Sequence, residues 1–166
     1  ICRAYWKLQE AWDRYQNGPL PTNTTSTKPT AEDSYSSNNL KKALVAVDAG
    51  ASPGGWTKFL VDHVQCQHVY SIDPGVLAPP VLAMPQVQHL KMTLQSALPQ
   101  IAVLQQQQSK TKPWHHTSVD VYVSDMCVKD MPAQLEGLEQ AAHLGVIGPG
   151  TFFVLTLKCT EGHSSK

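Results

Sequence analysis

The chain has 166 residues, with 13 basic and 13 acidic side chains, so its formal net charge at pH 7 is zero. This length is enough for one domain with a buried core. The balanced net charge does not indicate a polyanionic or polycationic partner. No apolar run reaches the roughly 18 residues that a membrane span needs. Its four cysteines are widely spaced without a C-x-x-C pattern, which argues against zinc and against a disulfide framework. We therefore expect reduced, mostly buried thiols, no metal and no membrane partner.

The first predicted element is a helix over residues 4–16, in which Tyr5, Leu8 and Trp12 recur along one stripe. Residues 17–39 then consist largely of Pro, Thr, Ser and Asn, a composition typical of a disordered or loosely packed insertion. We expect one domain over residues 1–166 with this low-complexity insertion at 17–39. Because the chain begins with Ile1 rather than Met, we expect it to be a fragment or a trimmed chain.

Apolar strands and helical spans alternate along the rest of the chain. We predict strands at 43–48, 68–72, 87–90, 119–124 and 151–157, helices at about 54–65, 93–107 and 132–144, and a loop at 74–86. This alternation is typical of an α/β fold with a doubly wound, mostly parallel sheet. Since the chain ends soon after its last strand, we expect the sheet to be truncated at its C-terminal end.

The most informative segment is AVDAGASPGGW, from Ala46 to Trp56. An apolar strand ends in Asp48 and continues through small residues into a turn, and the next helix presents its N-terminus to the same place. Glycine allows the backbone to approach a ligand closely, and the turn after the first parallel strand is the usual site for an adenosine-type ligand. The glycine spacing is not G-x-G-x-x-G, and the segment has no phosphate-binding lysine, which disfavours a dinucleotide-dependent dehydrogenase.

Three acidic residues, Asp48, Asp73 and Asp125, each stand where a predicted strand ends. The C-terminal ends of parallel strands meet at one edge of a sheet, which is the ligand edge. An acid after the second strand is well placed to accept hydrogen bonds from a ribose diol, although any one of the three could be a helix cap or a turn residue. Lys158 directly follows the last strand, where it is either a solvated end residue or a lysine held beside Asp125.

The methionine, cysteine and histidine residues elsewhere in the chain are weaker evidence for a functional site. Met126 and Cys127 suit the lining of a pocket, with ordinary core packing as the alternative. His115 and His116 lie in a polar loop without a second pair of ligands, so they do not predict a metal site.

Several of these segments resemble one known family. RAYWKL from Arg3 is similar to its S-R-A-x-x-K-L segment, and VDAGASPGGW from Val47 closely matches its V-D-L-G-A-A-P-G-G-W cofactor loop. Ile72-Asp73-Pro74 and VSDM from Val123 match its next acidic strand ends, and the segment from Pro149 to Lys158 matches a lysine-bearing last strand. The chain thus resembles the FtsJ/RrmJ-type ribosomal RNA 2′-O-methyltransferases, which are class I S-adenosylmethionine-dependent methyltransferases with a Rossmann-like fold.

The resemblance implies both a cofactor site and a catalytic set. S-adenosylmethionine would bind over the glycine loop. The second lysine of a Lys-Asp-Lys-Glu tetrad would orient or deprotonate a ribose 2′-hydroxyl of RNA, with ribosomal RNA the expected substrate. The sequence leaves the oligomeric state open, and we expect a monomer. The implied catalytic residues are Lys7, Asp125 and Lys158. The implied cofactor-binding residues are Asp48, Gly50, Ser52, Pro53, Gly54, Gly55, Trp56, Asp73 and Asp125.

The sequence departs from the family pattern at four places. Thr93 stands where the family has an adenine-contacting acid, and Leu155 stands where the pattern would place the lysine, with Lys158 three residues further on. Glu161 is too close to Lys158 to be assumed as the tetrad glutamate. The segment after Met126 reads Cys-Val-Lys where the family usually has Ala-Pro.

Two alternatives stay open beside the RNA enzyme. A class I methyltransferase acting on a small molecule or a protein would share the cofactor loop without needing Lys7 and Lys158. A cofactor-binding or RNA-binding pseudoenzyme would explain the missing glutamate and Thr93. A glutamate in a P-S-R-x-x-S-x-E-like segment beyond residue 166 would favour the active RNA enzyme.

Overall fold

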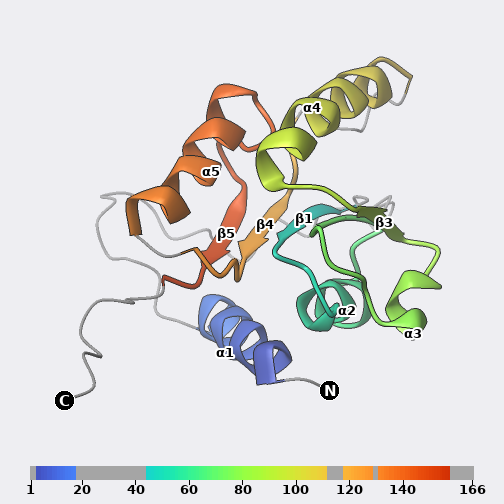
Figure 1. Ribbon diagram of the computed structural model, residues 1–166, viewed down its shortest axis with the longest axis vertical. Helices are drawn as coiled ribbons and strands as arrows, with labels where there is room; N and C mark the ends of the chain where they lie inside the picture. Colours follow the sequence, from blue (N-terminus) through green and yellow to red (C-terminus); the bar gives the residue numbers. More distant parts are fainter. Residues whose placement is uncertain (1–2, 18–43, 112–117, 129–130, 158–166) are drawn as a thin grey trace, which may run out of the picture.

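The computed structural model describes residues 3–17, 44–111, 118–128 and 131–157 (Figure 1). Apart from Asn17, the predicted insertion at 17–39 lies outside these residues. The described helices are α1 (Arg3–Asn17), α2 (Gly55–Asp62), α3 (Pro79–Leu82), α4 (Leu94–Thr111) and α5 (Met131–His143). The described strands are β1 (Val45–Ala49), β2 (His68–Ile72), β3 (Val87–Leu90), β4 (Val121–Ser124) and β5 (Phe152–Leu155).

The five described strands form one parallel sheet in the order β3-β2-β1-β4-β5. β1 is central and pairs with β2 on one side and with β4 on the other. The chain therefore winds outward in both directions from β1, which confirms the predicted doubly wound α/β fold. In such a sheet, the carboxyl ends of β1 and β4 border the crevice where ligands bind.

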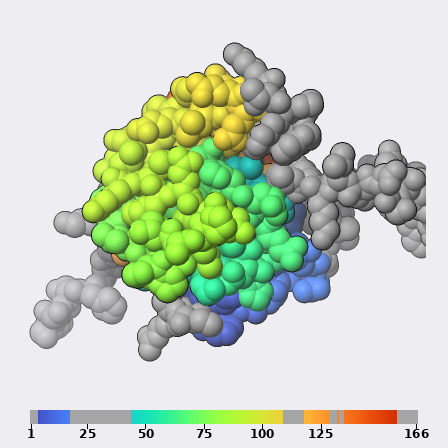
Figure 2. Space-filling model, turned by 90° about the vertical axis from the view of Figure 1, so that its right-hand side faces the viewer, coloured from blue at the N-terminus to red at the C-terminus, as the bar shows by residue number. Residues whose placement is uncertain are grey.

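β1 is buried along its whole length because helices cover both faces of the sheet (Figure 1). Val45, Val47 and Ala49 belong to the apolar core under α4 and α5. Ala46 belongs to a second core under α1 and α2. A parallel strand covered on both faces is apolar almost throughout. This is why β1 appears in the sequence as a continuous apolar run rather than as alternating apolar and polar residues. Figure 2 shows the side of the molecule formed by α4 above and the segment from α3 to β3 below.

The predicted strands at 68–72 and 87–90 are confirmed with the same bounds, the other predicted elements are confirmed with shifted bounds, and one prediction is wrong. The loop predicted at 74–86 contains the short helix α3, which begins at Pro79. The segment is rich in proline, but proline is favoured in the first turn of a helix, where its missing N–H is not needed. Val81 of this helix packs with Ala51 and Leu77 beside the glycine loop. The predicted helix at 93–107 also continues through the glutamine run to Thr111.

The predicted stripe on α1 is confirmed and attaches this helix to α2. Tyr5 and Leu8 are buried, and the Tyr5 ring meets the ring of Phe59 edge-on with centroids 5.3 Å apart. The indole N–H of Trp56 donates to the carbonyl of Ala4. α1 is therefore held to α2 by both side-chain packing and a hydrogen bond.

Two cysteines lie among the described residues, and they differ in their exposure to solvent. Cys66 is buried, and burial raises the pKa of its thiol to about 12, so it stays protonated. Cys127 is exposed and, like Met126, lines a cavity, as the pocket-lining interpretation of these two residues predicts. None of the helices in the described ranges is long and apolar enough to cross a membrane.

Candidate functional site

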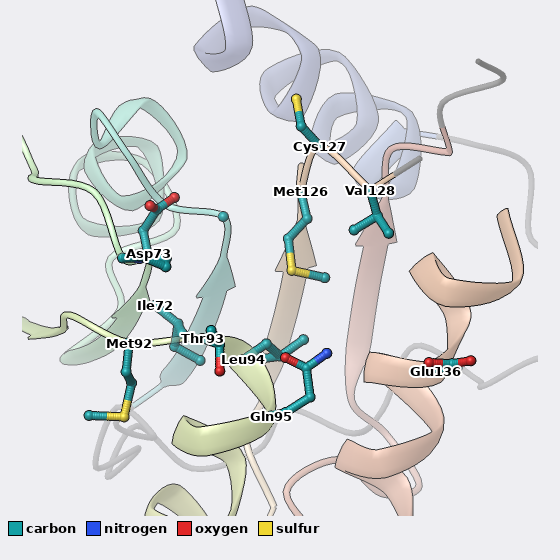
Figure 3. A pocket seen from close by; sticks show the side chains of 12 residues that line it. Ile72, Asp73, Met92, Thr93, Leu94, Gln95, Met126, Cys127, Val128 and Glu136 are labelled. Carbon is teal, nitrogen blue, oxygen red and sulfur yellow. The ribbon is translucent and has the colours of Figure 1, made fainter. Parts of the chain in front are cut away.

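A cavity of about 390 Å³ opens at the C-terminal ends of the central strands. It lies between the glycine loop, the start of α4, the segment after β4 and one side of α5 (Figure 3). This is the position that the sheet topology predicts for a ligand, and the volume falls in the range of roughly 300–1,000 Å³ of small-molecule sites. Its lining residues are Gly50, Ile72, Asp73, Pro74, Met92, Thr93, Leu94, Gln95, Met126, Cys127, Val128 and Glu136.

Gly50 lines the cavity in the loop after β1. Its φ of +82° is one that side-chain-bearing residues rarely adopt. A Cβ added there would stand 3.0 Å from the backbone of Met126. Its N–H donates to the carbonyl of Ile72 at 2.9 Å. The loop after β1 therefore lies directly against the segment after β4, and only glycine allows this approach.

Asp73 is fixed at the cavity by two backbone hydrogen bonds. The N–H of Ser52 donates to one carboxylate oxygen at 3.0 Å, and the N–H of Gly75 donates to the other at 2.7 Å. A Cβ on Gly75 would come within 2.9 Å of this carboxylate, so the turn requires glycine. An ionised carboxylate has about four acceptor positions, so each oxygen can still accept a hydrogen bond from a ligand hydroxyl.

Lys7 and Asp125 meet beside this cavity. The Lys7 Nζ atom is 3.7 Å from an Asp125 carboxylate oxygen. Asp125 follows β4, where its N–H donates to the carbonyl of Ala49, and its side chain is only 17% exposed. Lys7 comes from α1, outside the sheet, and its side chain is 53% exposed. The structure thus brings together two side chains that are separated by most of the chain, at the same edge as Asp73.

Asp48 takes a different position, beneath the cavity rather than in its lining. It is 1% exposed, and the Thr57 hydroxyl donates to one of its carboxylate oxygens at 2.7 Å. The same hydroxyl is 2.8 Å from that of Ser71. Burial raises the pKa of Asp48 to about 7, partly offset by the Thr57 hydrogen bonds, with Asp125 and Asp73 adding to the increase.

The other predicted residues support the site without lining the cavity. The Ser52 hydroxyl donates to the carbonyl of Val76. Gly54 adopts a φ of +113°, and a Cβ there would meet Val81 at 2.9 Å. Trp56 is 3% exposed and packs toward α1. Among the residues predicted to bind the cofactor, Gly50 and Asp73 line the cavity and the Pro53–Trp56 segment forms the turn and the start of α2.

The structure describes all of β5 and the chain after it as far as Leu157. Lys158 lies outside the described residues. Leu155, where the family pattern would place a lysine, is partly buried and packs against the core under α4 and α5.

Two polar residues of the cavity, Gln95 and Glu136, were not predicted from the strand ends. Gln95 lies in the first turn of α4, five residues beyond the end of β3 at Leu90, so the strand-end rule does not reach it. Glu136 lies on α5, and nothing in its sequence context distinguishes it from a solvated helix residue. No group of three or more His, Cys, Asp or Glu side chains in the described part of the chain is arranged to hold a metal.

The parallel sheet and the cavity at its central strand ends are those of a Rossmann-like domain. A family model described as FtsJ-like methyltransferase matches residues 1–147. The chain belongs to this family, whose members are generally S-adenosylmethionine-dependent.

Curated relatives match parts of the chain. A protein named ribosomal RNA large subunit methyltransferase M from Xylella fastidiosa (strain M23) is 48% identical over 54 residues, which are 31% of this chain and 14% of that protein. The protein of the same name from Teredinibacter turnerae is 34% identical over 87 residues, covering 52% of this chain and 20% of the relative. The matches thus span at most about a fifth of the length of these relatives.

A solved structure supports the fold alone. The crystal structure of a protein assigned as a hemolysin in Lactococcus lactis aligns with a TM-score of 0.52 at 17% identity. The alignment covers 85% of this chain and 52% of that one.

Proposed function

We propose that this protein transfers a methyl group from S-adenosylmethionine to a ribose 2′-hydroxyl of RNA, with ribosomal RNA as the substrate. The observation that carries the proposal is the Lys7–Asp125 pair at 3.7 Å beside a cavity of about 390 Å³. Membership of the FtsJ-like family and the names of the matched relatives support the same activity.

The cavity fits the proposed cofactor in shape and in chemistry. Its walls are largely apolar, which suits a planar base, and Asp73 has acceptor positions for the two hydroxyls of a ribose. Gly50 leaves room for close contact with the ligand, because it carries no Cβ. When bound, the cofactor supplies a methyl group on a positively charged sulfur, already activated for transfer.

The residues of the chain then have to position the ribose. Asp125 attracts the Lys7 ammonium and orients it, and the ammonium has N–H donors for the 2′-oxygen. Lys158 is proposed as the residue that takes the hydroxyl proton. Positioning of this kind accounts for much of the rate enhancement that a protein must provide when the transferred group is already activated.

Replacing Asp73 with alanine should weaken binding of S-adenosylmethionine by about 1–3 kcal/mol, the scale of losing charge-assisted hydrogen bonds. Isothermal titration calorimetry measures the change, and the thermal midpoint without ligand shows whether the loop has also loosened. Asp62→Ala, on the solvent side of α2, is the control and should bind normally. Unchanged affinity in Asp73→Ala would remove Asp73 from the ligand site.

The activity is tested on the full-length protein with ribosomal RNA and methyl-labelled cofactor. A 2′-O-methyl group blocks alkaline cleavage at the adjacent phosphodiester, so the label should remain in alkali-resistant dinucleotides. Label recovered in mononucleotides would show base methylation and contradict the proposal. Binding of the cofactor without any transfer to RNA would favour the non-RNA enzyme or the pseudoenzyme.

A further inference from the structure

The cavity has polar side chains at both ends and apolar walls between them. Asp73 stands at one end, and Gln95 and Glu136 stand at the other, on α4 and α5 (Figure 3). The surfaces between these polar ends are apolar and formed by Ile72, Met92, Leu94, Met126 and Val128. A nucleoside whose ribose bonds to Asp73 would therefore lay its base between the apolar residues and direct the far edge of the base at Gln95 and Glu136.

Thr93 also lines the cavity, but it offers only a neutral hydroxyl there. It stands where the family resemblance leads us to expect an acid, but its hydroxyl donates to that of Ser96 at 3.1 Å in the first turn of α4. Gln95 and Glu136 make no hydrogen bond or ion pair with any residue in the described ranges. Their polar atoms are thus available to a ligand.

We infer that Gln95 and Glu136 together recognise the 6-position of the purine in the bound nucleoside, selecting a 6-amino purine over a 6-oxo purine. The inference rests on the proposed function, because it assigns the base end of the proposed cofactor to this wall. It replaces the single acid expected at position 93 by two residues from two helices.

The two side chains make different contributions to this recognition. A carboxylate only accepts hydrogen bonds, so Glu136 pairs with an exocyclic amine and is left facing a lone pair when position 6 carries an oxygen. A carboxamide has one acceptor and two N–H donors and can turn over, so Gln95 can bond to either purine. Glu136 therefore provides the selectivity, and Gln95 provides affinity for both bases.

This division of roles gives a test that needs no catalysis. The probes are S-adenosylhomocysteine and its deaminated analogue S-inosylhomocysteine, titrated calorimetrically into the full-length protein. The unmodified protein should bind the adenosyl compound roughly 10²-fold more tightly, because the oxo compound leaves a charged acceptor unpaired. Glu136→Gln should bring the two affinities to within about threefold of each other, since an amide can serve either edge.

Gln95→Ala should show the complementary pattern. Both compounds should bind about tenfold more weakly, with the ratio between them unchanged, which corresponds to the loss of one hydrogen bond. The matched controls are Gln107→Ala on α4 and Glu139→Gln on α5, neither of which lines the cavity. Both controls should bind as the unmodified protein does.

Each outcome separates the inference from the proposed function. If the unmodified protein binds the adenosyl compound without preferring it, or if Glu136→Gln keeps the original ratio, the inference is wrong and the proposed cofactor stands. An unchanged affinity in Gln95→Ala removes Gln95 from the base end. If neither compound binds the folded protein, the proposed function and the inference fail together.

Discussion

Methyl transfer to RNA should fall by about 10³-fold when Asp125 is replaced by asparagine, because a preorganised electrostatic contact at a reacting group contributes on that scale. This substitution keeps the shape of the side chain but removes the charge that holds the Lys7 ammonium. Cofactor affinity should change much less than the rate, since the cavity is built mainly from other residues. Single-turnover measurements with labelled cofactor separate the rate from binding.

The double variant tests whether Lys7 and Asp125 act as one unit. Groups that act together show strongly non-additive effects, so Lys7→Ala combined with Asp125→Asn should be little worse than Asp125→Asn alone. Lys58 and Asp62 form an ion pair at 2.5 Å on the surface of α2 and provide the matched control. Their substitution should leave transfer unchanged. Additive losses at Lys7 and Asp125 would show that the two side chains act separately.

The second large effect concerns the buried Asp48. Its pKa is raised from 3.8 to about 7 by burial, so the folded state holds a proton that the unfolded state has released. The free energy of unfolding should therefore decrease as the pH rises from about 4 to about 7, by up to about 4 kcal/mol. Above pH 7 both states are ionised, and the decrease is complete.

Asp48→Asn should remove this part of the pH dependence, because the amide stays neutral at every pH. The variant should be the more stable protein at pH 8 and should differ little from the original near pH 4. Urea denaturation across this range measures the difference, with Asp62→Asn as a surface control that keeps the original slope. A variant whose slope matches that of the unmodified protein would contradict the assignment.

The sequence predicted the sheet and the glycine loop because each depends on local pattern. The β1 run is apolar because both of its faces are covered, and the small residues after it are required by the close approach of Gly50 to Met126. Asp73 and Asp125 could be assigned to one edge because parallel strands bring their carboxyl ends together. The helix α3 was missed because Pro79 has opposite meanings at the start and in the middle of a helix.

Gln95 and Glu136 could not be predicted in the same way. Which side of α4 or α5 meets the cavity depends on how the two helices pack over the sheet. A glutamine or a glutamate on a helix looks the same in sequence whether it faces solvent or a ligand. Their role follows only from the three-dimensional lining of the cavity. The placement of Lys158 stays a prediction.

The attachment of α1 has a consequence for how the site can be switched on and off. Lys7 is carried by a helix that lies outside the sheet and is held through Tyr5, Leu8 and the bond from Trp56 to Ala4. Helices at the margin of a fold open more readily than central strands. Local opening of α1 would withdraw Lys7 from Asp125 and leave the cavity walls in place. Amide hydrogen exchange along α1 would then report the fraction of molecules competent for transfer, independently of how many hold the cofactor.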